Sequence, residues 1–170
     1  MKTNIVIFAA LMAALTNVLS VEPFAIPLVL GPFVSRIHLS QLPIFLSSCL
    51  AGPWAGLVTG AIGGIYMSVT AVPFIVGGLG LLGFSSGFLS RRWGLRPFLA
   101  SLLAWCVQAV YVFITDYFWF MAVTGMPHPV AIGVVSNILI KLTVEVAISS
   151  ILVEMLILSI KRSGYYSYFT

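Results

Sequence analysis

The longest apolar stretch of the sequence runs from Val130 to Ile160 and carries three charged residues, Lys141, Glu145 and Glu154. A helix of about 20 such residues spans the ~30 Å hydrocarbon core of a bilayer, so this stretch is long enough to cross it. The rest of the chain is similar, because 61% of its 170 residues are hydrophobic and 7% are charged. A soluble domain of this length has too little interior to hide so much apolar surface. The composition therefore predicts an all-α integral membrane protein that crosses the bilayer several times, with almost no soluble part.

Apolar segments separated by proline- and glycine-rich stretches divide the chain into six predicted transmembrane helices, all within one domain of residues 1–170. The sequence AGP at residues 51–53 joins two of them in a tight hairpin, because Gly suits the end of a helix and Pro the start of the next. The stretch at residues 20–39 contains several prolines and is predicted to be an ordered outer loop. The predicted helices cover roughly residues 3–19, 40–50, 53–70, 74–89, 98–120 and 130–160.

Basic residues predict the orientation of these helices. Six crossings with both ends on one side place six basic residues on that side and leave Arg36 opposite. The six are Lys2, Arg91, Arg92, Arg96, Lys161 and Arg162. The positive-inside rule makes their side cytoplasmic, so both termini are predicted to be cytoplasmic. The net charge of +4 then reflects topology and attraction to anionic lipid, and no interleaved basic and aromatic pattern indicates a nucleic-acid partner.

The first twenty residues allow a second interpretation. A basic start, an apolar centre and a small residue at Ser20 also describe a signal peptide, whose cleavage would leave five helices. Loop charges do not separate the two cases, because the later helices keep the same orientation in both. An intact mass measurement distinguishes them.

Three polar residues, Asn137, Lys141 and Glu145, recur at every fourth position of the last apolar stretch. Counting about 20 residues back from the inner end of the helix places Lys141 near the outer boundary of the hydrocarbon core. Asn137 then lies about 6 Å further out and Glu145 about 6 Å deeper. Ionisable groups at that depth are costly unless paired or hydrated, so the stripe is predicted to face the bundle interior and a ligand. The alternative is a local ion pair between Lys141 and Glu145 that only permits insertion.

The outer end of the fifth predicted helix supplies aromatic rings and an acid that we expect to face this stripe. They are Tyr111, Asp116, Tyr117 and Trp119. Aromatic stacking surfaces beside one acid and one base suit a planar, polar heteroaromatic ligand. Phe33 and His38 of the first loop are predicted to cover this ligand. The alternatives are an interfacial aromatic belt for Trp119 and solvated side chains for the loop residues. Gln108 is expected to bond a neighbouring helix, and Glu154 receives no role.

The sequence lacks several motifs that would indicate an enzyme. Without a G-x-x-x-x-G-K-[ST] loop the chain has no ATPase site of its own, and without H-E-x-x-H or G-x-S-x-G it lacks a hydrolase constellation. His38 and His128 would leave the coordination of a metal incomplete, and Cys49 and Cys106 lie in separate apolar segments. We therefore predict no enzymatic activity, no cofactor, no metal and no disulfide.

The first predicted helix contains FAALMAAL, in which Ala9 with Ala13 and Ala10 with Ala14 form two overlapping pairs of small residues. Such a flat face lets another helix approach closely, inside this chain or outside it. This helix, the Pro-rich loop and the segment LSQLPIFLSSCLAGPWAGLVTGAIGG follow one another in an order that resembles the substrate-binding S component of energy-coupling-factor (ECF) vitamin transporters.

The resemblance implies partners and a substrate class. In that family the alanine face contacts a membrane-embedded coupling (T) subunit, and two cytoplasmic ATPases supply the energy through it. Substrate binds in the outer half, under the first loop and between helices four to six. The lysine, the asparagine, the acid and the aromatic residues are compatible with riboflavin, thiamine, a pyrimidine precursor or a related vitamin. A likeness of VLSVEPFAIPL, Asn137 and Lys141 to riboflavin-type members favours riboflavin, although Gln41 stands where many of those carry an acid. The alternatives are an independent small transporter or channel and, less well matched, a membrane enzyme.

Overall fold

The computed structural model describes residues 3–24, 26–30 and 33–163, and for residues 22, 28–30 and 33–35 it describes the backbone alone. Within this part the chain is helical apart from one β-hairpin that follows the first helix. The elements in order are α1 (Thr3–Leu19), the 3-10 turn η1 (Glu22–Phe24), β1 (Ile26–Leu30), β2 (Phe33–Ile37), α2 (Gln41–Ala51), α3 (Pro53–Gly63), α4 (Ile65–Thr70), α5 (Ile75–Arg92), α6 (Pro97–Ala122) and α7 (His128–Arg162).

The predicted helices agree with these elements in most places and differ in two. The hairpin between α2 and α3 turns at Gly52, whose φ of 97° is a left-handed conformation that Gly adopts without strain. The predicted third helix, residues 53–70, is interrupted at Gly64 and becomes α3 and α4, since two adjacent glycines weaken a helix. The outer loop, for which we predicted order but no strands, contains the antiparallel pair β1 and β2.

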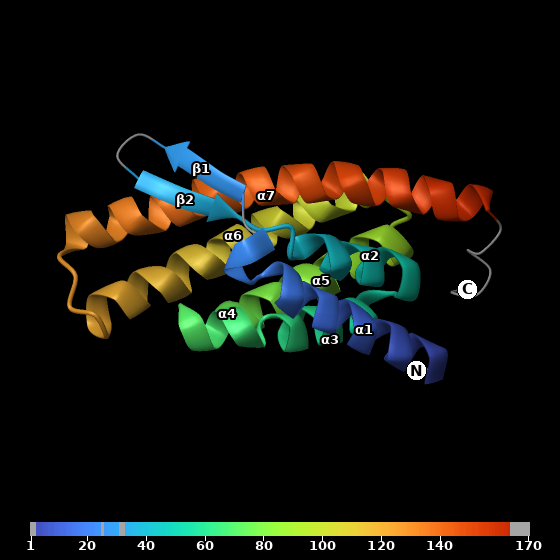
Figure 1. Ribbon diagram of the computed structural model, residues 1–170, viewed down its shortest axis with the longest axis horizontal. Coiled ribbons are helices and arrows are strands. Elements are labelled where there is room, and N and C mark those ends of the chain that lie inside the picture. The colour runs from blue at the N-terminus through green and yellow to red at the C-terminus, as the bar shows by residue number, and fades with distance from the viewer. Residues whose placement is uncertain (1–2, 25, 31–32, 164–170) are drawn as a thin grey trace.

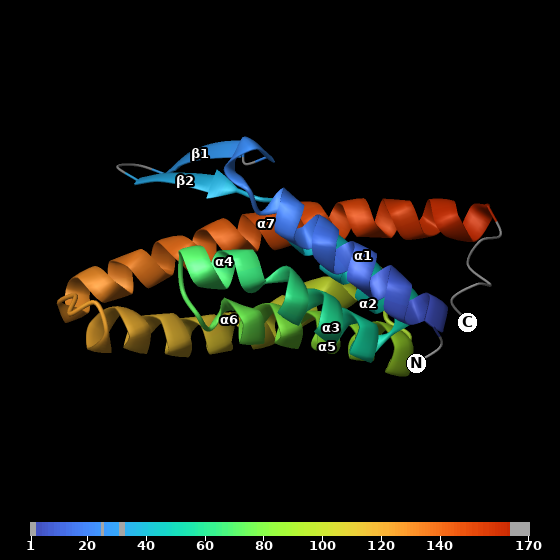
Figure 2. The ribbon, with the colours of Figure 1, turned by 60° about the horizontal axis from the view of Figure 1, so that its bottom comes forward.

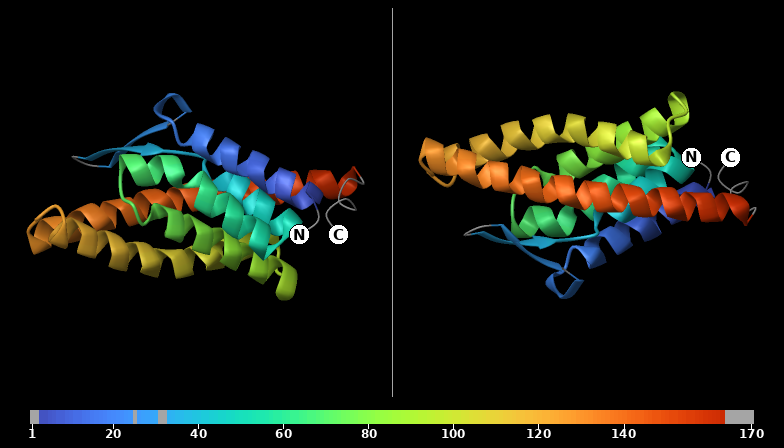
Figure 3. Two further views of the ribbon diagram at one scale, coloured as in Figure 1. Left: turned by 90° about the horizontal axis from the view of Figure 1, so that it is seen from below. Right: turned by 90° about the horizontal axis from the view of Figure 1, so that it is seen from above.

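Helix α7 runs along the whole molecule, and α6 runs antiparallel beside it over most of that length (Figure 1). The start of α1 and the end of α7 lie at the same end of the molecule. Figure 2 shows the β-hairpin lying over the first half of α7, which β2 contacts. At the opposite end α6 and α7 project beyond the other helices and are joined by residues 123–127 (Figure 3). The shorter helices therefore pack against one half of a long helical pair.

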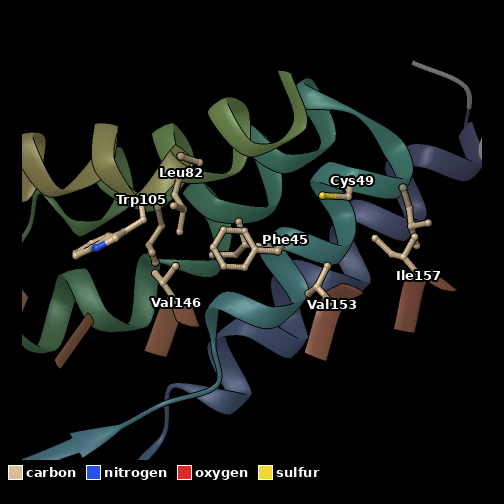
Figure 4. Packing of buried hydrophobic residues seen from close by; sticks show 11 residues of the cluster. Phe45, Cys49, Leu82, Trp105, Val146, Val153 and Ile157 are labelled. Carbon is tan, nitrogen blue, oxygen red and sulfur yellow. The ribbon is translucent and has the colours of Figure 1, made fainter. Parts of the chain in front are cut away.

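Helix α2 is the centre of the packed core. Eight of its 11 residues are buried, and it is in contact with α1, α3, α5 and α7. Phe45 and Cys49 of α2 lie between α5, α6 and α7 (Figure 4). The labelled partners in that view are Leu82, Trp105, Val146, Val153 and Ile157. A helix enclosed on all sides reads as apolar around its circumference, which explains why its sequence shows no polar face.

Glycines allow α3 and α5 to touch backbone to backbone. A Cβ added to Gly56 would meet the carbonyl of Gly83, and one added to Gly60 would meet the carbonyl of Leu79 and lie 2.9 Å from the nitrogen of Gly80. Gly56 and Gly60 therefore let α3 pack closely against α5, as small residues do between helices in lipid.

Polar side chains also join the helices. Thr59 on α3 donates to Ser47 Oγ on α2 at 2.8 Å, and Ser48 Oγ donates to Ser86 Oγ on α5 at 3.2 Å. Glu154, to which the sequence assigned no role, accepts a hydrogen bond from the backbone N–H of Phe98 at 3.0 Å. That N–H lies in the first turn of α6 and has no partner within its own helix, so Glu154 fastens the start of α6 to α7.

Within the described residues, α6 and α7 are long and apolar enough to cross a membrane by length and composition. α1 and α2 are shorter apolar helices. Lipid-facing side chains are abundant on the long pair, for example Val110 at 61% exposed and Phe118 at 63%. In water such a surface would be strongly unfavourable, whereas in a bilayer it faces acyl chains.

We predict that Gly60→Ala destabilises the protein by about 1–3 kcal/mol, because the added methyl group strikes the backbone of α5, which has no flexible atom to give way. Gly133→Ala is the matched control, since nothing lies within 4 Å of its added Cβ and Ala favours a helix over Gly. Thermal melting in detergent measures both. A Gly60→Ala melting temperature equal to that of Gly133→Ala would contradict the close packing of α3 on α5.

Candidate ligand-binding cavity

A cavity of about 390 Å³ lies between α4, α5, α6 and α7, at the point where β2 leads into α2. This volume falls within the range of about 300–1,000 Å³ that is typical of small-molecule sites. Its wall is mainly apolar, with Phe74 and Tyr111 contributing rings. Its ionisable lining residues are Arg36, His38, Asp116, Lys141 and Glu145. An apolar enclosure with a few polar groups is the usual form of a site that holds an organic ligand.

Glu145 connects three parts of this wall. Its carboxylate is 1% exposed and accepts a hydrogen bond from the backbone N–H of His38 at 2.7 Å. The same oxygen lies 3.5 Å from Lys141 Nζ, one turn earlier on α7. A buried carboxylate is tolerated when it is paired and hydrogen-bonded, and both conditions are met here. Glu145 therefore holds the end of β2 against α7 and positions Lys141 at the cavity.

Lys141 keeps capacity for a ligand. Its side chain is 19% exposed and lines the cavity. An ammonium group has three donors, and the ion pair with Glu145 engages it from one direction. The two interpretations from the sequence, a ligand contact and an ion pair that only permits insertion, both fit this position, because Glu145 lines the same cavity and its pair with Lys141 brings the lysine there.

The α6 wall carries an acid and a phenol. Asp116 is 6% exposed, and Thr115 Oγ1 donates to its Oδ1 at 3.4 Å. The Tyr111 hydroxyl donates to the carbonyl of Phe74 at 3.2 Å and lies against Gly77, where a side chain would displace it. Tyr111 is thus fixed in orientation, with its ring at the cavity.

Of the four remaining residues predicted for the site, Tyr117, Trp119 and Asn137 lie outside the cavity wall. Tyr117 stacks on Phe113 and its hydroxyl is 2.5 Å from His128 Nδ1, while the ring of Trp119 meets Phe74 edge-on at 5.9 Å. Asn137 is half-buried on α7 outside the cavity wall. The side chain of Phe33 lies outside the part of the chain that the structure describes. Ligand contacts by these four residues stay predictions.

Sequence reasoning missed two glutamines in the cavity wall. Gln41 begins α2 and is fully buried, and Gln108 on α6 is 2% exposed. Gln108 was expected to bond a neighbouring helix, but among the described residues its Oε1 has no hydrogen-bond partner. An amide buried inside a membrane bundle costs free energy unless it is hydrogen-bonded. A glutamine in a predicted membrane helix is therefore a candidate ligand contact, and this argument could have identified both residues from the sequence.

The four alanines of α1 divide between the interior and the surface. Ala9 and Ala13 are fully buried within the chain, and Thr59 Oγ1 on α3 donates to the carbonyl of Ala9 at 3.2 Å. Ala10 and Ala14 are exposed on the other side of the helix. Only this second pair is accessible to another protein.

A mainly helical chain with apolar helices long enough to cross a bilayer and a cavity of small-molecule size has the features of a membrane protein that binds a ligand. The family model described as "ECF-type riboflavin transporter, S component" matches residues 1–162. The chain belongs to this family and is therefore the substrate-binding component of an ECF transporter, as its motif order predicted. No curated protein and no solved structure gives a significant match.

We expect Glu145→Ala to loosen the junction between β2 and α2, because the His38 N–H loses its buried acceptor. A hydrogen bond to a charged group contributes about 1.5–3 kcal/mol, so exchange of the His38 amide with deuterium should accelerate about ten- to a hundredfold. Glu145→Gln keeps an acceptor oxygen and should stay near the parent rate. Peptides from α5 serve as an internal reference. Equal exchange in the parent and Glu145→Ala would show that the bond does not hold the hairpin.

Proposed function

We propose that the chain is the high-affinity riboflavin-binding subunit of an ECF-type importer and that the cavity beside Lys141 is its substrate site. The observation that carries the proposal is a cavity of about 390 Å³ with aromatic rings and the Lys141–Glu145 ion pair in its wall, in a chain of this family. The ring system of riboflavin is planar and heteroaromatic, so aromatic side chains of the wall can stack on it. Its edge is polar, so charged side chains of the wall can form hydrogen bonds with it.

Of the residues predicted from the sequence, those in the wall are the proposed substrate contacts. They are Lys141, Asp116, Tyr111 and His38, with Glu145 as a positioning residue for Lys141 and for the end of β2. The hairpin β1–β2, continuous with His38, is proposed to cover the entrance. No metal takes part in this proposal. Among the described residues, no three His, Cys, Asp or Glu side chains lie close enough together to hold a metal ion.

The proposed topology has six crossings with both termini in the cytoplasm, α3 and α4 together forming one. It is supported by the position of the basic residues, because the ends of α5 and α7 and the start of α6 lie at the same end of the molecule as the start of α1 (Figure 3). Lys161 and Lys141 are 20 residues apart on α7, about 30 Å at 1.5 Å per residue. The cavity then lies in the outer half of the bilayer.

The proposed partners are a membrane-embedded coupling (T) subunit and two cytoplasmic ATPases, which family membership implies. Ala10 and Ala14 offer the coupling subunit a flat strip on the outer face of α1. Close approach of helix backbones is the main source of helix affinity in lipid, where apolar surface alone gives no preference.

Riboflavin should bind to the purified chain and be identified by mass after release from it. If the Lys141 ammonium contacts riboflavin, Lys141→Met should raise the dissociation constant about ten- to a hundredfold. This factor corresponds to the loss of a charge-assisted hydrogen bond, which contributes about 1.5–3 kcal/mol. Arg162→Met, an exposed change at the far end of α7, is the control. Isothermal titration measures all three proteins. A parent chain that does not bind riboflavin would refute the proposed substrate.

The double change Lys141→Met with Glu145→Gln separates binding from stability. If Lys141 serves only as the partner of Glu145, Lys141→Met leaves a buried carboxylate alone and lowers the melting temperature while binding stays normal. The double variant should then recover stability. If Lys141 contacts riboflavin, the double variant still binds weakly.

Replacing Ala10 or Ala14 with Trp should abolish riboflavin uptake by cells while the purified chain binds riboflavin normally, because both alanines face outward and away from the cavity. Ala13→Trp is the contrasting variant, since Ala13 is fully buried and the change should prevent folding. Uptake by radiolabel and binding by titration are compared. Normal uptake by Ala10→Trp would place the coupling surface elsewhere.

A further inference from the structure

Two glutamines among the residues that line the cavity have buried amide atoms without a hydrogen-bond partner in the described structure. Gln41 is 0% exposed, and neither its Oε1 nor its Nε2 has a partner among the described residues. Gln108 is 2% exposed, and its Oε1 is likewise without one. Buried polar atoms in native proteins are nearly all satisfied, so each exception calls for an explanation. Two exceptions in the wall of one cavity have a common explanation, which is that a ligand supplies the missing partners.

Both side chains are held in place by their surroundings. Gln41 is the first residue of α2, and the segment before it is fixed by the bond from His38 to Glu145. On the other side, α6 places Gln108 against Gly78 of α5, where an added Cβ would lie 3.6 Å from Gln108 Nε2. Groups whose positions are set before binding lose little entropy when a ligand arrives.

The two walls differ in hydrogen-bonding character. The α6 wall presents acceptors, namely Gln108 Oε1 and the Asp116 carboxylate two turns further on. α7 contributes the Lys141 ammonium, a donor, beside the Glu145 carboxylate with which it is paired, and α2 contributes the Gln41 carboxamide, which can both donate and accept. A neutral amide can form a paired contact with a ring edge that carries an N–H beside a C=O, whereas a carboxylate could only accept.

We propose that Gln41 and Gln108 determine the ligand specificity of the cavity. Gln41 pairs with the imide edge of the flavin ring, and Gln108 accepts a hydrogen bond from a ribityl hydroxyl. This assignment rests on the proposed function of the cavity as a riboflavin site. It divides the ligand between the two walls, with ring carbonyls toward Gln41 and Lys141 and hydroxyl donors toward Gln108 and Asp116.

Titration with three flavins tests the assignment. Riboflavin has both ring imide and ribityl chain, lumiflavin lacks the chain, and 3-methylriboflavin lacks the imide N–H. Gln41→Met should weaken riboflavin and lumiflavin about ten- to a hundredfold each and should reduce the discrimination against 3-methylriboflavin. Gln108→Met should weaken riboflavin by a similar factor and leave lumiflavin within about threefold of the parent value.

Stability of the ligand-free variants separates a binding role from a structural one. Each Gln→Met change replaces an unsatisfied buried amide with an apolar side chain of similar length, so the melting temperature should stay equal or rise. Ser150→Ala is the matched control, because Ser150 Oγ is also buried with no hydrogen-bond partner among the described residues, but Ser150 lies outside the cavity wall. It should leave all three affinities unchanged.

The outcomes distinguish this inference from the proposed function. A parent chain that binds no riboflavin refutes both. A parent that binds riboflavin while Gln41→Met and Gln108→Met keep affinities within about threefold refutes the inference alone. If Gln108→Met weakens lumiflavin binding by the same factor as riboflavin binding, the assignment of Gln108 to the ribityl chain is refuted.

Discussion

The buried carboxylate of Glu145 is the interaction on which the organisation of the cavity depends. It is 1% exposed, yet it joins two segments that are far apart in sequence, because its oxygen accepts from the His38 backbone while it pairs with Lys141. Leaving such a group unpaired inside a bundle would cost several kcal/mol. The chain is therefore constrained to bring the end of β2 against α7, which fixes the start of α2 and with it one wall of the cavity.

Close packing below the cavity supplies the rigidity that this wall needs. Backbone contacts at Gly56 and Gly60 bring α3 against α5, and α2 is enclosed between them and α7. The same glycines leave little room for α3 and α5 to shift against each other, because their backbones are in contact. Toward the other half the interruption at Gly64 lets α4 stand apart as a separate wall element, and space for a ligand opens there.

The parts of this structure that the sequence predicts are those set by local periodicity. The span of α1, the turn at Gly52 and the inward position of Lys141 and Glu145 follow from apolar runs, Gly–Pro chemistry and the cost of charge in lipid. Spacing could not tell which of two overlapping alanine pairs is covered, because Ala9 and Ala10 look alike until α3 is placed. The β-hairpin was missed for a related reason, since its strands are paired with each other and their pattern is interrupted by Pro27.

The contrast between Glu145 and Gln41 shows how the fold divides stability from function. Both are buried polar residues at the cavity, but Glu145 is satisfied within the chain whereas, in the described structure, Gln41 is not. A sequence selected for stability alone would replace an unsatisfied amide, so its presence is best explained by a partner that comes and goes. Binding then satisfies the amide and stabilises the folded chain in proportion to ligand concentration, which gives the empty and loaded forms different stabilities.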